Sequence, residues 1–308
     1  MSYNLQHCVL CQWSRFITHR PAQGIGQCRE VQFSRLQVAG FASPVMTLPA
    51  MNAEKEWYIL PKGDPHASDF PLMGGGESMA AVVVLYLLTA TQGPRLMSMC
   101  KPFQLNLLLI VYNFFMVVLS VYMFTVGAYL TIATDHSFVC TTVEEAHSKG
   151  HSALIYHGAW LFVFSKLLEM ADTVFFILRK KFNQVTFLHV YHHSSMFVFS
   201  WVVFKYVPGG QFLVYPLFNS FVHIIMYTYY ALAAMGPSVQ KYLWWKRYLT
   251  MLEIAQFVIL LAFTLVNIVA ECDFPKGFSY AALVYGLTYL LLFINFYRRS
   301  FSSKDKGQ

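Results

Sequence analysis

The stretch VTFLHVYHHSSMFVFSWVVF, residues 185–204, is the most informative part of the chain. It is apolar along most of its length and has about the 20 residues that a helix needs to cross a bilayer. Three histidines interrupt it: His189, His192 and His193. On a helix they fall within an arc of about 100°, so they share one side. Because polar groups at hydrocarbon depth are costly and mark functional sites, the stretch predicts a histidine cluster inside a membrane.

The composition of the whole chain is typical of a membrane protein. Hydrophobic residues make up 56% of its 308 residues and charged residues 12%, whereas soluble domains contain about 25% charged residues. A water-soluble protein with this pattern would have to bury nearly every helix on all sides. We therefore expect an all-α, polytopic membrane protein with seven transmembrane helices, near residues 79–90, 104–130, 154–178, 185–204, 212–235, 248–270 and 279–297.

Positive charge alternates between the loops. The loops after the first, third, fifth and seventh expected spans are rich in Lys and Arg, and the others contain little positive charge. Lys and Arg favour cytoplasmic loops, so the pattern predicts a cytosolic C-terminus and a non-cytosolic N-terminus. The net charge of +7 follows from these loops. Since no basic stripe with interleaved aromatic residues occurs elsewhere, we expect no nucleic-acid partner.

Two of the six cysteines fall in loops assigned to the lumenal side. These are Cys140 and Cys272, and an oxidising compartment would allow a disulfide between them. Two free thiols are the alternative interpretation. The pair Cys8 and Cys11 has the spacing of half a zinc site, but no second pair completes it, and we expect no metal.

The chain divides into four parts by composition. Residues 1–50 contain four Arg, one acidic residue and three of the cysteines. We interpret them as an atypical N-terminal extension that is disordered or not part of the functional protein, with Met51 as an alternative start. A lumenal N-terminal segment (51–77), the seven-helix domain (78–298) and a cytosolic tail (299–308) follow.

Helical rise predicts which polar groups can meet inside the membrane. Four expected spans carry polar residues at about 10 to 20 Å from their cytosolic ends: Lys166, Glu169 and Asp172; His189, His192 and His193; Asn219 and His223; and Glu253 and Gln256. This predicts a buried site reachable from the cytosol. A structural network of paired charges is the alternative for the first three, and a core histidine is the alternative for His223. We interpret Tyr227 as packing and tunnel lining.

Two chemistries suit a His-x-x-His-His cluster in a membrane. A di-iron site, as in membrane desaturases and hydroxylases, uses imidazole ligands, but those enzymes have about eight histidines in three boxes and this chain has one box. The second chemistry is nucleophilic attack of an imidazole on a thioester, which gives an acyl-imidazole. It requires one or two histidines, a neighbouring acid or base and cytosolic access, and the sequence supplies all of these.

From about residue 64 to the C-terminus the chain resembles the ELO/ELOVL family of very-long-chain fatty acid elongases. The resemblance rests on KLLEMADT (166–173), HVYHH (189–193) and NSFVHIIMYTYY (219–230). Residues 174–181 and 240–250 are most similar to the branch that acts on very-long-chain and polyunsaturated substrates. One residue departs from the family pattern: Glu253 replaces the first Gln of Thr-x-x-Gln-x-x-Gln, while Gln256 retains the second.

The resemblance implies a 3-ketoacyl-CoA synthase of the endoplasmic reticulum. Such an enzyme condenses a long-chain acyl-CoA with malonyl-CoA and needs no cofactor beyond these substrates. The family fold implies six helices around an acyl tunnel and a seventh helix outside it. Partners implied are the bilayer, the two CoA substrates and other enzymes of the elongation cycle, with homo- or hetero-oligomers left open. A catalytically silent carrier or scaffold with the same fold is the alternative.

The mechanism that we expect gives each site residue a role. His192 is the nucleophile, His223 assists it, and His189 and His193 orient it and stabilise the oxyanion, with Asn219 as a further donor. The remaining assignments are supporting residues, Lys166, Glu169, Asp172 and Gln256, and residues that attract CoA phosphates, Arg179, Lys180, Lys181, Lys246 and Arg247.

The last five residues are similar to a retrieval signal of the endoplasmic reticulum. Lys304 and Lys306 have the Lys-x-Lys-x-x spacing of a C-terminal dilysine signal. Such a signal acts only in the cytosol, where the charge pattern already places this end. A solvated charged tail is the alternative.

Overall fold

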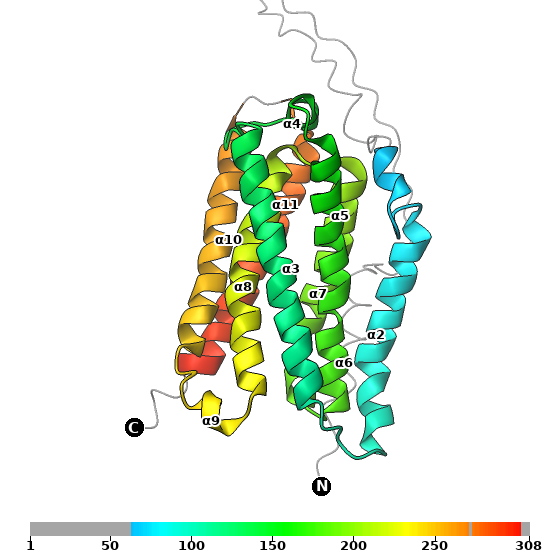
Figure 1. Ribbon diagram of the computed structural model, residues 1–308, viewed down its shortest axis with the longest axis vertical. Coiled ribbons are helices and arrows are strands. Elements are labelled where there is room, and N and C mark those ends of the chain that lie inside the picture. The colour runs from blue at the N-terminus through cyan, green and yellow to red at the C-terminus, as the bar shows by residue number, and fades with distance from the viewer. Residues whose placement is uncertain (1–62, 271–272, 303–308) are drawn as a thin grey trace, which may run out of the picture. The chain divides into compact units, whose positions relative to one another are not determined.

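The computed structural model describes residues 63–270 and 273–302, and all regular elements of these residues are helices (Figure 1). This confirms the predicted all-α class. The main helices are α2 (Gly76–Ser98), α3 (Asn106–Ala133), α5 (Ser152–Glu169), α6 (Ala171–Leu178), α7 (Phe187–Tyr206), α8 (Val214–Ala234), α10 (Lys246–Val269) and α11 (Lys276–Tyr297). Shorter elements connect them: η1 (His66–Asp69), α4 (Val143–Ser148), η2 (Phe182–Gln184), η3 (Gly210–Leu213), α9 (Pro237–Gln240) and η4 (Arg298–Ser302).

Several of these helices have the length and composition of membrane spans, as expected of a multi-pass membrane protein. Among the described residues, five segments qualify: Gly76–Ser98, Asn106–Ala133, Gly210–Ala234, Lys246–Val269 and Lys276–Phe301. The two other predicted spans correspond to α5 with α6 and to α7. These helices contain the charged residues and the histidine cluster, which lower their mean hydropathy. The count of seven spans therefore stays a prediction.

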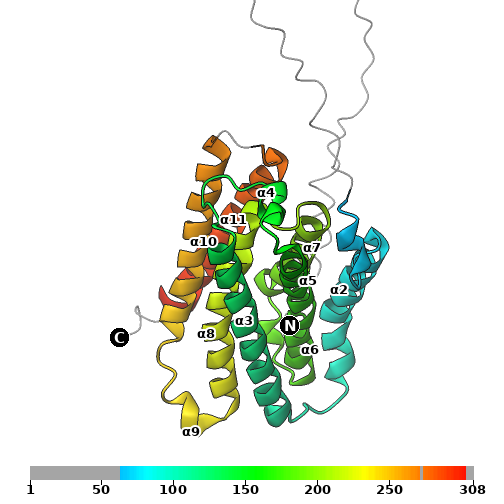
Figure 2. The ribbon, with the colours of Figure 1, turned by 45° about the horizontal axis from the view of Figure 1, so that its top comes forward.

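Six helices of the described domain form a closed ring (Figures 1 and 2). In order around it, α3 packs against α8, α8 against α10, α10 against α11, α11 against α7, α7 against α5, and α5 against α3. Helix α2 lies outside the ring, against α6 and α7. The structure therefore has the arrangement that the resemblance implied, with the polar helices α5 and α7 as neighbours.

Helix α2 is longer than the sequence indicated. The expected span ended at Ala90 because Gln92, Gly93, Pro94 and Arg95 follow it, yet the helix continues to Ser98. Proline in a helix interior removes one backbone hydrogen bond and usually ends or kinks the helix. Packing of the last turns of α2 against α6 offsets this cost, since Met97 is buried.

A break in helical geometry separates α5 from α6. Met170 ends one helix and begins the other, and it makes a short-turn bond from its N–H to the carbonyl of Leu167. Such a break weakens the regular backbone ladder. The hydroxyl of Tyr112 on α3 donates to the carbonyl of Leu168 at 3.1 Å. The break lies directly between Glu169 and Asp172, two of the predicted site residues.

Two helix starts follow from capping side chains. The Thr186 hydroxyl accepts from the N–H of His189 at 3.3 Å and begins α7 just before its histidines. The Thr142 hydroxyl accepts from the N–H of Glu145 at 3.1 Å and begins α4. Ser, Thr, Asp and Asn at this position satisfy N–H groups that a helix leaves without a partner. The Thr186 cap, three residues before His189, therefore starts α7 just ahead of the first histidine of the cluster.

The loops around α4 cover one end of the ring (Figure 1). Gly210 lies beneath the Thr141–Val143 backbone with φ of +55°, and Gln211 donates its N–H to the Thr141 carbonyl at 2.9 Å. Asn267 of α10 accepts from the N–H of Cys140 at 2.9 Å. We call this the covered end, and the end where α6 finishes and α10 begins the basic end.

Several predictions fall partly or wholly outside the described residues. Cys140 forms a disulfide, but the predicted partner, Cys272, lies outside the described residues, so the pairing stays a prediction. The same holds for the extension 1–50 and for Lys304 and Lys306. Gly63 to Gly75 of the predicted lumenal segment are described, and they contact the ring: Asp64 donates its N–H to the carbonyl of Lys205 at 2.8 Å.

Candidate active site

An apolar cavity runs through the ring of helices. All six ring helices line it, and on α7 the lining extends from His192 to Phe204. Twelve residues of helix correspond to about 18 Å. Most of the lining side chains are apolar, for example Leu130, Phe162 and Phe212. The cavity is therefore long and predominantly apolar.

His192 is the histidine of the cluster that faces this cavity. It lines the wall together with Asn219 of α8 and Gln256 of α10. Its ring makes edge contacts with Tyr289 and Phe293 of α11, with ring centres 5.2 and 6.1 Å apart. The imidazole thus turns toward the interior and not toward lipid, and the α11 aromatic rings hold it there.

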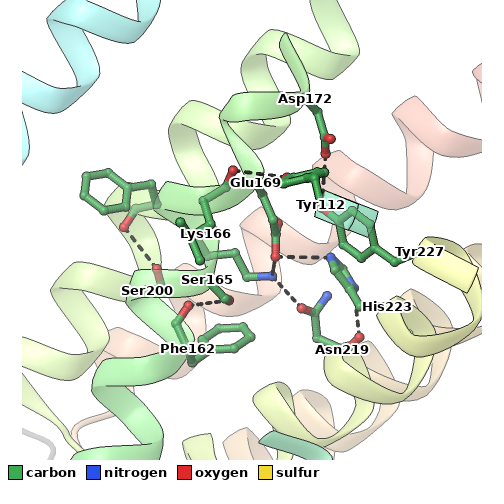
Figure 3. Close-up of polar contacts among 12 residues, drawn as sticks. Tyr112, Phe162, Ser165, Lys166, Glu169, Asp172, Ser200, Asn219, His223 and Tyr227 are labelled. Carbon is green, nitrogen blue, oxygen red and sulfur yellow. Dashed lines mark hydrogen bonds and ion pairs between the residues drawn. The ribbon is translucent and has the colours of Figure 1, made fainter. Parts of the chain in front are cut away.

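Behind this wall, a buried ion pair on α5 is hydrogen-bonded to α8 (Figure 3). The Lys166 ammonium donates to Glu169 Oε1 and to Asn219 Oδ1, both at 2.7 Å. Lys166 and Glu169 are only 1% and 2% exposed. Charges taken out of water require such close partners. The sequence placed these residues at one depth, and the structure brings them into contact.

His223 completes this cluster (Figure 3). Its Nδ1 lies 2.8 Å from the backbone carbonyl of Asn219, and its Nε2 lies 3.5 Å from Glu169 Oε1. A carbonyl oxygen can only accept, so Nδ1 carries a proton and donates it. Nε2 consequently faces the carboxylate. His223 is next to Asn219, which reaches the cavity, but it does not itself belong to the cavity lining.

The two remaining histidines of the cluster turn away from the cavity. His189 Nε2 lies 2.8 Å from the Thr173 hydroxyl of α6. The rings of His189 and His193 are 4.4 Å apart, and those of His193 and His192 are 5.3 Å apart. His193 is buried, and its Nδ1 has no hydrogen-bond partner among the described residues. The three histidines share one side of α7, as predicted, but contact different neighbours.

Asp172 has a partner that the sequence interpretation missed. The Tyr227 hydroxyl of α8 donates to Asp172 Oδ2 at 3.0 Å (Figure 3). The sequence predicts packing and tunnel lining for Tyr227; the residue is fully buried, but it is not part of the cavity wall. Its place four residues after His223 puts both side chains on one face of α8, which is the signal that could have indicated the contact.

The predicted CoA-binding cations lie at the basic end. Arg179, Lys180 and Lys181 follow α6, and Lys246 and Arg247 begin α10. Lys180 donates to the carbonyl of Ser98 at 3.3 Å, and Arg247 donates to the Tyr297 hydroxyl at 2.6 Å. Of the two α10 residues in the divergent motif, Gln256 lines the cavity, whereas Glu253 is half-buried and does not.

Comparison with known proteins decides the family. The ELO family, described as the GNS1/SUR4 family, matches residues 71–308. The chain belongs to the ELO family. The proteins named very long chain fatty acid elongase 4 of Mus musculus and Homo sapiens are both 43% identical to this ELO protein, over 80% and 79% of its chain and 78% and 77% of theirs. Very long chain fatty acid elongase 7 of Drosophila melanogaster is 39% identical over 79% of this chain and 74% of its own.

Proposed function

We propose that this ELO protein is a very-long-chain 3-ketoacyl-CoA synthase. It would condense a long-chain acyl-CoA, saturated or polyunsaturated, with malonyl-CoA and release a 3-ketoacyl-CoA, CO2 and CoA. The names of the relatives support fatty acid elongation. The observation that carries the proposal is the position of His192, which is the cluster's histidine on the wall of an apolar cavity.

The proposed reaction has two half-reactions. In the first, a ring nitrogen of His192 attacks the thioester carbonyl, the carbon–sulfur bond breaks, and CoA leaves with a proton as the thiol. In the second, malonyl-CoA loses CO2, and the carbanion left at its α-carbon attacks the acyl-imidazole carbonyl. The carbon–nitrogen bond then breaks, and the departing imidazolate takes up one proton, supplied from solvent through the neighbouring His223, which regenerates the neutral imidazole. Such covalent intermediates divide one difficult step into two easier ones.

Neighbouring groups are suited to support these steps. Asn219 lines the same cavity as His192, and its side-chain oxygen accepts from Lys166, so its amide N–H would be available to donate to an oxyanion. Donors that are positioned before the reaction stabilise developing charge with little reorganisation. His223 and Glu169 would accept and return protons behind Asn219. His189 and His193 would orient the nucleophile, and Asp172 would hold Tyr227.

The basic end is the proposed entrance for both substrates. Arg179, Lys181 and Lys246 would attract the CoA phosphates while the acyl chain enters the cavity. This requires the basic end to face the cytosol, in agreement with the preference of Lys and Arg for cytoplasmic loops. We also propose residence in the endoplasmic reticulum. The dilysine spacing of Lys304 and Lys306 supports it, because the same orientation places this signal in the cytosol. Replacing both lysines is expected to release the protein from this compartment.

Mass spectrometry of the purified protein tests the proposal. After incubation with a long-chain acyl-CoA and no malonyl-CoA, His192 is expected to carry the acyl group, and added malonyl-CoA should remove it. His192→Ala should neither acylate nor elongate. His157→Ala is the matched control, because His157 lies on α5 outside the cavity lining, and its ring packs against Tyr122 and Trp160. An active His192→Ala variant would exclude the nucleophile assignment.

A labelled malonyl-CoA assay separates an enzyme from a silent carrier with this fold. The enzyme should incorporate label into products two carbons longer, and a carrier should incorporate none. Assays across acyl-CoA chain lengths would also define the substrate range.

A further inference from the structure

Helix α2 lies outside the ring, yet one of its side chains reaches the histidine cluster. The Tyr86 hydroxyl lies 2.9 Å from Thr173 Oγ1 on α6, and the same oxygen lies 2.8 Å from His189 Nε2 on α7. Tyr86 is 5% exposed and Thr173 is 0% exposed. Three polar groups from three helices therefore form a hydrogen-bonded chain away from water.

The direction of this chain follows from counting donors and acceptors. Among the described residues, Thr173 is the one hydrogen-bond partner of the Tyr86 hydroxyl. Within the same part of the chain, the Thr173 hydroxyl has two partners, Tyr86 and His189, and no others. If His189 Nε2–H donated to Thr173, one of the two hydroxyl hydrogens would have no acceptor. A buried polar group without a partner is destabilising, because it has lost its hydrogen bonds to water and gained none in return. All three groups are satisfied only when Tyr86 donates to Thr173 and Thr173 donates to Nε2.

We propose that Tyr86 is a positioning residue of the active site: through Thr173 it holds His189 in the tautomer with Nδ1 protonated and Nε2 unprotonated. This rests on the proposed function for its effect on catalysis. In this tautomer Nε2 accepts from Thr173, and Nδ1–H is the donor of the His189 ring. The His189 ring packs 4.4 Å from that of His193, which packs 5.3 Å from that of His192. The orientation of His189 is thereby set by α2, which lies outside the six-helix ring.

The sequence of α2 allows this helix to approach α6 closely enough for the contact between Tyr86 and Thr173. Its buried residues are Tyr86, Ala90 and Met97, and Gly93 continues the same stripe. A Cβ at Gly93 would lie 2.9 Å from Ile177 Cδ1 of α6. Small residues at such spacing allow two membrane helices to approach closely. Ala90 and Gly93 thus bring α2 near enough to α6 for the Tyr86 hydroxyl to contact Thr173.

Kinetics of conservative variants test the proposal. Tyr86→Phe keeps the ring and removes the hydroxyl, so kcat for elongation is expected to fall about fivefold, the equivalent of one hydrogen bond of about 1 kcal/mol. The KM values for both CoA substrates should not change, because Tyr86 does not line the cavity. Thr173→Val should lose at least as much, Thr173→Ser should retain activity, and Tyr86→Phe combined with Thr173→Val should be no worse than Thr173→Val alone.

Tyr122→Phe is the matched control, since Tyr122 lies exposed on α3 with its ring against His157. Its kcat should equal that of the wild type. Wild-type kcat in Tyr86→Phe, or additive losses in the double variant, would overturn the proposal. If Tyr86→Phe does not fold, the comparison of Thr173→Ser with Thr173→Val decides, and equal kcat values in these two variants would overturn it as well.

A second readout does not depend on activity. Solid-state NMR of protein labelled with 15N-histidine distinguishes protonated from unprotonated ring nitrogens, and His189→Gln assigns the signals. We expect Nε2 of His189 to be unprotonated in the wild type and both tautomers to be populated in Tyr86→Phe, where Thr173 is free to accept. A protonated Nε2 in the wild type would overturn the tautomer assignment. A wild-type protein that shows this tautomer but elongates nothing would instead contradict the proposed function.

Discussion

Lys166 and Glu169 illustrate what a buried charge requires of its neighbours. Each has the other as its ionic partner at 2.7 Å, and both are almost completely buried. Removing one member leaves an unpaired charge in the protein interior, which costs about 3–5 kcal/mol in buried pairs. We therefore expect Lys166→Met and Glu169→Gln each to lower the unfolding temperature in detergent.

The double variant separates stability from function. Lys166→Met with Glu169→Gln removes both charges, so its unfolding temperature should exceed that of either single variant. Elongation should be lost in the double variant as in each single variant, because Asn219 and His223 no longer have their charged partners. If each single variant unfolds at the wild-type temperature, the two side chains are not a buried ion pair.

His136 predicts a pH dependence at the covered end. It lies in the loop after α3, and neither ring nitrogen has a partner among the described residues. Burial lowers the pKa of His136 below its usual 6.5, and Lys149 adds to this against the opposing effect of Glu145. The unfolded chain then binds the proton more readily, so stability falls as pH drops below about 6.5, by at most about 1.4 kcal/mol per pH unit.

Unfolding temperatures of wild type and His136→Leu between pH 5 and 8 test this effect. The wild type should lose stability toward the acid end more steeply than the variant. Parallel curves for the two proteins would show that His136 does not contribute.

At the scale of elements, the short helix η3 that precedes α8 depends on its first residue, Gly210. Its φ of +55° belongs to the left-handed region, and a Cβ would lie 2.9 Å from the Thr141 carbonyl oxygen. Strain of this kind costs about 1–3 kcal/mol. Gly210→Ala should therefore lower the unfolding temperature. Gly277→Ala is the control, because nothing lies within 4 Å of its Cβ position, and it should leave the temperature unchanged or raise it.

Apolar runs predicted the helices well where nothing interrupts them. The expected span 104–130 became α3, and 248–270 became α10, each with ends within three residues. The prediction for α2 ended too early because Pro94 resembles a stop signal, and only packing against α6 shows that the helix continues. The break at Met170 has no Gly or Pro to indicate it. It depends on contacts with other helices, such as Tyr112, which sequence periodicity does not contain.

At the scale of the whole molecule, helical rise predicted a common depth for the site but not the partners within it. It placed Lys166 and Glu169 level with His223, and the structure joins them. Rise alone could not show that His192 faces the cavity while His189 contacts Thr173. That division depends on how the helices are rotated about their axes. Tyr86 escaped notice for the same reason, since a single tyrosine in an apolar span is indistinguishable from packing.

The cavity also connects the site to the covered end, and its length yields the last prediction. Ser200 is buried on α7, lines the cavity, and lies eight residues, or about 12 Å, from His192. Ser200→Phe would fill the cavity at this level, so the longest products should become shorter while shorter acyl-CoA substrates are still elongated. Val198→Phe is the control, since Val198 is on the same helix outside the cavity lining, and it should keep the wild-type product lengths. Gas chromatography of the products measures both. Unchanged products in Ser200→Phe would mean that the acyl chain does not reach this level of the cavity, because the added ring lies on the wall between His192 and Phe204.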